Sequence, residues 1–171
     1  METERLLFRR PTAADVPAIF ERYASDPEVV RYMSFPRHRS LDDTRLFLEL
    51  SDAQWASWNT GPLLAFSRAD GSLLGAAGLH LDTMLGAGTG YVFARDAWGK
   101  GYATEALTAM VGLAAQRGLG ALSAICHVDH RPSWHVMEKC GFARQRVLPR
   151  HMVFPNISPE PLDVYLYTRQ V

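Results

Sequence analysis

A loop that contains two glycines and a lysine joins two regular segments near the middle of the chain. Tyr91 to Arg95 has the pattern of a strand, and residues 103–116 carry apolar side chains at helical spacing. The loop between them reads Trp98-Gly99-Lys100-Gly101-Tyr102-Ala103-Thr104. Glycines let a backbone approach a ligand closely, and the first N–H groups of a helix lack internal acceptors. The spacing therefore predicts a phosphate-binding loop, with a purely geometric turn as the alternative.

The pattern of this loop excludes two common nucleotide sites and resembles a third kind. It contains neither G-x-x-x-x-G-K-[ST] nor G-x-G-x-x-G, so neither a nucleoside triphosphatase nor a dinucleotide-binding fold is indicated. It resembles the acyl-CoA loop Q/R-x-x-G-x-G/A of the GNAT superfamily of N-acetyltransferases, with Trp98, Gly101 and Ala103 at the defined positions. Its extended form is similar to the RimJ/RimL-type branch. The resemblance implies that acetyl-CoA is the cosubstrate and that no metal is needed.

A second motif, His130 to Phe142, resembles the GNAT element N-x-x-S/A-x-x-x-x-E-K-x-G-F. His130 stands where the family usually has asparagine; histidine is a poorer helix cap, but it could bond a pantetheine carbonyl. Met137 stands where many members have a tyrosine acid, and it cannot donate a proton. The resemblance thus makes Ser133 the candidate acid for the departing thiolate, with a structural serine as the alternative.

The resemblance also assigns the strand before the loop to the cofactor. In the family this strand separates from its neighbour and pairs with the pantetheine arm, with Phe93 at the pairing position. A free N–H near Val92 or Phe93 would then stabilise the oxyanion. The alternative is that both are ordinary buried strand residues. The full set of expected cofactor-binding residues is Val92, Phe93, Trp98, Gly99, Lys100, Gly101, Tyr102, Ala103, Thr104, His130 and Ser133.

Direct acyl transfer also needs a base to deprotonate the amine. Many family members place a glutamate on the strand before the loop, where this chain has Gly88 and Thr89. His80 and His151 are the candidate bases, because an imidazole has a reference pKa of about 6.5. The alternatives are that these histidines are structural and that ordered water removes the proton.

Composition and charge favour a cytoplasmic enzyme with a small anionic ligand. The 171 residues fit a single GNAT domain over 1–171, and the first residues do not resemble a signal peptide. Cys126 and Cys140 are expected in the core rather than in a disulfide or metal site. The chain is neutral overall, which argues against nucleic-acid binding, but residues 95–150 carry a net charge of +4. That segment suits the phosphates of coenzyme A.

The periodicity along the chain predicts the order β-α-α-β-β-β-α-β-α-β-β. This is the order of the GNAT fold, an α/β (α+β) fold with a mixed, mostly antiparallel seven-stranded sheet and about four helices. Two helices are expected before the first hairpin, opened by Thr12 and Ser40. Gly86, Gly88 and Gly90 are expected to precede the strand that enters the loop. A proline-rich loop is expected between the last two strands, which cover about 142–153 and 163–171.

These observations predict an N-acetyltransferase that transfers the acetyl group of acetyl-CoA to a primary amine by direct attack in a ternary complex. The amine would belong to a protein N-terminus or a small molecule. The alternatives are a GNAT-fold acyl-CoA-binding or sensor protein without catalysis, and a nucleotide-binding domain that does not use CoA. We expect no nucleic-acid or membrane partner, and a monomer or a homodimer.

Overall fold

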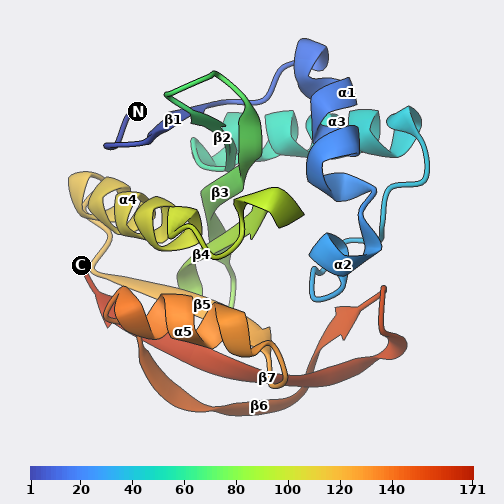
Figure 1. The fold of residues 1–171 in the computed structure, drawn as a ribbon. Helices are drawn as coiled ribbons and strands as arrows, with labels where there is room; N and C mark the ends of the chain where they lie inside the picture. Colours follow the sequence, from blue (N-terminus) through green and yellow to red (C-terminus); the bar gives the residue numbers. More distant parts are fainter.

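A seven-stranded sheet in the order β1-β2-β3-β4-β5-β7-β6 forms the centre of the computed structural model, which describes residues 1–171 (Figure 1). The strands are β1 (Leu6–Arg9), β2 (Pro62–Ser67), β3 (Leu73–Asp82), β4 (Gly86–Phe93), β5 (Ala121–His127), β6 (Ala143–Phe154) and β7 (Ser158–Gln170). All neighbouring strands are antiparallel except β4 and β5, which are parallel. The predicted mixed, mostly antiparallel sheet is confirmed.

Five α-helices surround the sheet, one more than the sequence predicts. They are α1 (Val16–Ile19), α2 (Pro27–Val30), α3 (Leu41–Trp58), α4 (Tyr102–Gln116) and α5 (Arg131–Lys139). The extra helix arises because α1 continues into a single π-helical turn, Phe20–Ala24, and then stops. Pro27 restarts the chain as α2, with the Asp26 side chain accepting a hydrogen bond from the N–H of Glu28 at 2.9 Å. None of the helices is both long and apolar enough to cross a membrane.

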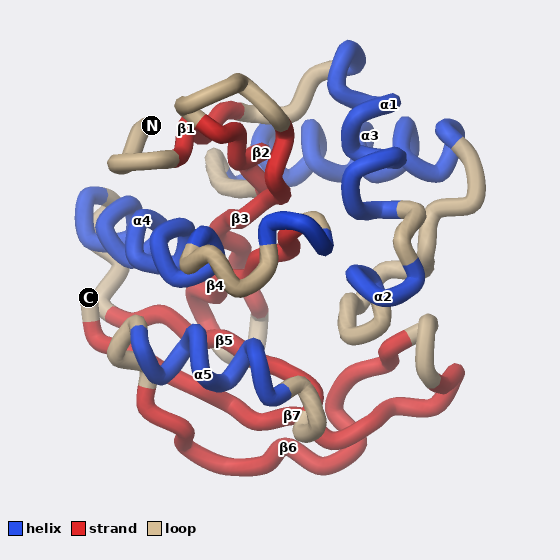
Figure 2. Tube along the Cα trace, viewed as in Figure 1, coloured by secondary structure: helices blue, strands red, loops and turns tan.

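The two faces of the sheet are covered by different helices (Figure 2). Leu107 and Met110 of α4 and Met137 of α5 are buried in the larger core, which also holds alternate side chains of β3, β4 and β5. On the opposite face Ile19 and Tyr23 pack against Ala76 of β3 and Val92 of β4, in a second core that includes residues of α2. Because side chains alternate along a strand, each central strand presents one set of residues to each helical layer.

Two predicted strand boundaries are wrong. The glycines at 86, 88 and 90 lie inside β4 rather than before it, because β3 and β4 remain in register from Gly75↔Phe93 to Asp82↔Gly86. Long antiparallel pairing outweighs the low strand propensity of glycine. Pro159 and Pro161 lie inside β7, where β6 pairs on one side and β5 pairs only from Val164 onward. Proline is tolerated there because no neighbour on the other side needs its missing N–H.

Candidate functional site

The loop between β4 and α4 presents a continuous run of free backbone donors. Gly99 and Gly101 have φ values of 72° and 82°, a left-handed conformation that glycine adopts without strain. None of the six N–H groups from Gly99 to Thr104 donates to an acceptor in the protein. These donors lie at the N-terminus of a 15-residue helix, where the helix dipole is positive. The geometry can therefore bind an anion such as a diphosphate.

A partly exposed ion pair fixes this loop to the first strand. The Glu105 carboxylate accepts hydrogen bonds from the Thr3 hydroxyl at 2.6 Å, the Arg5 backbone N–H at 2.8 Å and the Arg5 guanidinium at 2.7 Å. The same guanidinium donates to the Lys100 carbonyl at 2.8 Å and lies over the Tyr102 ring at 4.6 Å. Burial opposes ionisation, but these hydrogen bonds hold the pKa of Glu105 below its usual range.

Beside the loop lies an open hollow with a volume of about 700 Å³. It is lined by Thr3, Glu4, Arg5, Gly101, Thr104, Glu105, Thr108, Ala109 and Lys139. Lys139 is the last residue of α5 and Gly101 is the N-cap of α4, so the two sequence motifs meet at this hollow. Arg5 and Lys139 contribute its positive charges. The hollow adjoins the donors of the loop, and its charged lining consists of Arg5, Lys139, Glu4 and Glu105.

Trp98 points back to β4 instead of outward. Its indole N–H donates to the Phe93 carbonyl at 2.7 Å, although 48% of the residue is exposed. The Phe93 side chain is buried in the core. Trp98 thereby fixes the end of β4 relative to the loop and uses one of the two lone pairs of this carbonyl.

β4 and β5 separate within the sheet. The only paired position between them is Gly88↔Ser123, so β4 beyond Gly88 has no strand neighbour on that side. The Ala94 N–H donates to β3 at 2.8 Å, and hydrogen-bonding direction alternates along an antiparallel strand. The N–H of Phe93 therefore faces the gap, whereas that of Val92 faces β3. Of the two expected oxyanion donors, Phe93 has the suitable direction.

Ser133 lies at the gap on the face covered by α4 and α5. Its hydroxyl is 3.0 Å from the Tyr91 hydroxyl, which comes from β4. Met137, one turn further along α5, is 2% exposed and part of the core, as its apolar side chain requires. Sequence reasoning missed the contact between Tyr91 and Ser133, because nothing in the sequence reports a pair 42 residues apart.

His130 is the N-terminal cap position of α5, but its side chain makes no capping hydrogen bond. Its ring stacks on Tyr32 at 4.5 Å, and Tyr32 also lies 5.1 Å from the ring of His127. Burial and the nearby His127 lower the pKa of His130 to about 4, so the ring is neutral near pH 7. His127 is buried, and its Nδ1 accepts the Asp129 N–H at 3.1 Å. Sequence reasoning missed this cluster of rings.

His80 lies on the opposite face of the sheet, at the point where β4 and β5 separate. It pairs with Gly88, and a Cβ added to Gly88 would be 2.4 Å from His80 Nε2. The imidazole thus covers the space that a side chain at position 88 would take. The residue is exposed, but packing of its ring against the sheet lowers the pKa of His80, while Asp82 opposes this shift.

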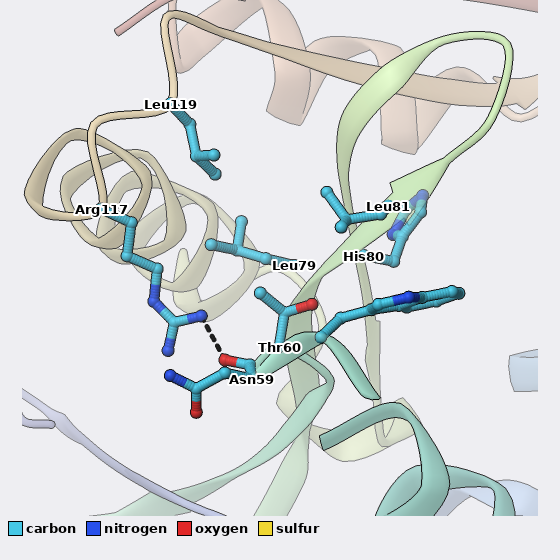
Figure 3. A pocket seen from close by; sticks show the side chains of 8 residues that line it. Asn59, Thr60, Leu79, His80, Leu81, Arg117 and Leu119 are labelled. Carbon is cyan, nitrogen blue, oxygen red and sulfur yellow. Dashed lines mark hydrogen bonds between the residues drawn. The ribbon is translucent and has the colours of Figure 1, made fainter. Parts of the chain in front are cut away.

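A second hollow, with a volume of about 250 Å³, opens beside His80. It is lined by Trp58, Asn59, Thr60, Leu79, His80, Leu81, Arg117 and Leu119. Figure 3 shows His80 and Leu81 on one side and Arg117 on the other, where its guanidinium donates to the Asn59 carbonyl. The ligand-accessible space next to this imidazole therefore lies at the end of the sheet.

His151 comes to the same region from β6. The pairing of β6 with β7 is interrupted between Leu148 and Met152, and Arg150 in this interruption has a φ of 46°. The N–H groups of Leu85 and Met84 hold the pKa of Asp82 low, and the charges of His80 and His151 add to this effect. The structure therefore brings both candidate bases near one carboxylate, and His80 lies on the face opposite Ser133.

Comparisons with known proteins agree with this architecture. A family model described as an acetyltransferase (GNAT) domain matches residues 5–143. A Bacillus subtilis (strain 168) protein named uncharacterized N-acetyltransferase YoaA is 28% identical over 169 residues, covering 96% of this chain and 94% of that protein. An acetyltransferase (GNAT family) from Bacillus anthracis superposes with a TM-score of 0.84 at 27% identity, covering 99% of this chain and 97% of the other. RimL, a ribosomal alpha-N-protein acetyltransferase solved with coenzyme A, shares the fold, with a TM-score of 0.85 at 18% identity over 99% and 96% of the two chains.

Proposed function

This chain belongs to the GNAT family of acetyltransferases, and we propose that it transfers the acetyl group of acetyl-CoA to a primary amine. The observation that carries the proposal is the run of free N–H groups from Gly99 to Thr104, next to the gap between β4 and β5. The donors suit the diphosphate of the cosubstrate, and the gap leads from them into the sheet. We further propose that residues 1–171 act as one domain of the RimJ/RimL type.

The residues of the chain divide the binding of acetyl-CoA among them. The loop donors and Lys100 hold the diphosphate, and the hollow lined by Arg5 and Lys139 takes the remaining phosphate. The N–H of Phe93 faces the gap, where it donates to the thioester oxygen as negative charge develops. His130 is neutral and can give one hydrogen bond to the pantetheine arm. Bound in this way, acetyl-CoA supplies an activated acyl group.

His80 is the preferred base of the two candidates. Its Nε2 takes the place of a side chain on Gly88, beside the last paired residue of β4 and β5. A lowered pKa keeps the ring neutral near pH 7, so it can accept a proton from the attacking amine. The proton would pass through ordered water, because five residues of β4, about 16 Å, separate Gly88 from Phe93. His151 is the second candidate, because it also lies near Asp82.

Ser133 is the proton donor on the other face of the gap. An amine that attacks from the side of His80 leaves the sulfur accessible to α5, where the Ser133 hydroxyl lies. Separate faces for base and acid suit a direct attack within a ternary complex. The acceptor is the primary amine of a protein N-terminus or of a small molecule. Both cysteines are free, as in the reducing cytoplasm where we propose that the enzyme acts.

The first experiment measures acetyl-CoA binding by calorimetry and then CoA thiol release with amines and N-terminal peptides. Gly101→Glu should weaken acetyl-CoA binding at least about 100-fold, because a carboxylate would occupy the anion site. Gly71→Glu is the matched control, since Gly71 has a similar φ of 73° and lies in a distant hairpin turn. Equal affinities in the two variants would contradict the proposal.

The two alternatives predict different results in the same experiment. Tight acetyl-CoA binding without thiol release for any amine would favour the non-catalytic acyl-CoA-binding protein. Three departures from the family pattern favour this second candidate. Gly88 and Thr89 occupy the stretch of the glutamate base, Met137 replaces the tyrosine acid, and His130 replaces the usual asparagine. Absence of acetyl-CoA binding by the natural chain would contradict both candidates.

A further inference from the structure

We infer that Tyr91 is a positioning residue that directs the hydroxyl proton of Ser133 toward the departing sulfur, an inference that rests on the proposed function. Tyr91 belongs to β4 and Ser133 to α5, so their contact crosses the gap between β4 and β5 on one face of the sheet. No other side-chain hydrogen bond joins these two elements.

The contact is specific at two atoms. The Tyr91 hydroxyl lies 3.0 Å from the Ser133 hydroxyl and 3.2 Å from the Ser133 carbonyl. Tyr91 sits three residues beyond Gly88, the last residue of β4 that pairs with β5. The side chain is therefore held by a strand whose other edge is open, at the depth where the pantetheine arm would end. Cys126 of β5 is buried in the larger core on the same face of the sheet.

The two hydroxyl groups can form two hydrogen-bond arrangements, which differ in the acceptor to which each proton is donated. When the phenol donates to the Ser133 carbonyl, the serine proton is used in a bond to the phenol oxygen. When the phenol donates to the serine oxygen, the serine proton is free to point into the gap. Developing negative charge on the sulfur favours the second arrangement. Tyr91 then also stabilises the serine oxygen while its proton leaves.

Burial keeps the Tyr91 hydroxyl and the Cys126 thiol protonated near pH 7. Burial raises the pKa of Tyr91 well above its usual range, and burial raises the pKa of Cys126 to about 12. The positive charge of Arg144 lowers the pKa of Cys126 and the negative charge of Glu138 raises it, so these two effects oppose each other. A neutral phenol can donate a hydrogen bond to Ser133 but does not compete with His80 for the proton of the amine.

The bonds and protons of the transfer balance with this assignment. The nitrogen–carbon bond forms and the carbon–sulfur bond breaks, while one proton passes from the nitrogen through ordered water to His80. Ser133 gives its hydroxyl proton to the sulfur and keeps the hydrogen bond from Tyr91. Ser133 takes a proton from water in the same step, so that no free alkoxide forms, and His80 then releases its proton to water. The tyrosine remains a phenol throughout.

The test combines turnover with a titration that needs no acceptor. Tyr91→Phe should lower kcat about 10-fold and Ser133→Ala about 100-fold, with the KM for acetyl-CoA changed less than about twofold. The double variant should be no slower than Ser133→Ala alone, because the two residues act as one unit. In complexes with CoA, ultraviolet absorbance of the thiolate should show that each variant raises the pKa of the bound thiol by about one unit.

Tyr23→Phe is the matched control, because it removes a buried phenol hydroxyl that has no hydrogen-bond partner. It should leave both kcat and the thiol titration unchanged. A bound thiol whose titration does not respond to Tyr91→Phe overturns the inference alone, whether or not an acceptor is known. Additive losses in the double variant also overturn it. A natural chain that does not bind CoA overturns the proposed function together with the inference.

Discussion

At the residue scale, the imidazole of His80 determines the pH dependence that we expect. Packing against the sheet lowers its pKa, so the neutral form that accepts a proton is present above this lowered value. The value of kcat/KM should therefore rise with pH through a pKa below about 6.5 and then level off. His80→Gln should lower kcat about 100-fold and remove this acidic limb. Initial rates over a pH series measure both effects.

His135 offers the control for that substitution. It is exposed on α5, outside the proposed site, so His135→Gln should preserve both the rate and the profile. A profile that keeps its acidic limb in His80→Gln would transfer the base assignment to His151 or to water.

The sequence predicted the residues of the loop and Ser133, but not their side-chain partners. The loop was recognisable because its glycines, lysine and helix start are adjacent in sequence. Tyr91 and His127 were missed because their roles depend on contacts with Ser133 and Tyr32, which come from distant segments. His80 was a candidate from its residue type and from its place at the end of a predicted strand. Its place over Gly88 required the register of β3 and β4.

At the element scale, Glu105 couples β1 to the N-terminus of α4. Glu105→Gln should lower the free energy of unfolding by about 1 kcal/mol at pH 7, a small value because Arg5 remains partly exposed. The lowered pKa means that this contribution is present above the usual glutamate range and is lost as pH falls through the folded-state value. Urea unfolding at pH 7 and in acid measures this difference.

The same variant should weaken acetyl-CoA binding about threefold, because Arg5 no longer holds the Lys100 carbonyl in place. Glu4→Gln removes an equal charge from the same hollow without breaking the contacts to Arg5. If Glu4→Gln changed stability and affinity as much as Glu105→Gln, charge rather than the tether would be responsible.

Local signals located most elements but misplaced their ends where pairing outweighs propensity. The capping box of Ser40 and Asp43 correctly opens α3. Periodicity also places α4 within a residue of its observed limits. The glycines of β4 and the prolines of β7 suggest loops when read locally, and only the neighbouring strands decide otherwise. The π-helical turn after α1 has no signal in the sequence that we can identify.

At the scale of the whole molecule, the sheet consists of two parts. The strands β1 to β4 form one part, and β5, β7 and β6 form the other, with Gly88↔Ser123 as the single paired position between them. Helices α4 and α5 pack against each other and bridge the two parts. The family order could be predicted from the sequence, but the separation of β4 from β5 was an implication of the resemblance and needed the structure to locate it.

A ligand that pairs with β4 inside the gap should join these two parts. If acetyl-CoA binds only the folded chain, a concentration of about 100 times its Kd should raise the free energy of unfolding by about 2.7 kcal/mol. Hydrogen exchange should slow at the amides of Phe93 and of Gly99 to Thr104, which have no acceptor in the free protein. Amides between β2 and β3 should be slow with or without the ligand, since those strands are already paired. Stabilisation with protection confined to the loop would place the ligand outside the gap and remove the basis for assigning Phe93 as the oxyanion donor.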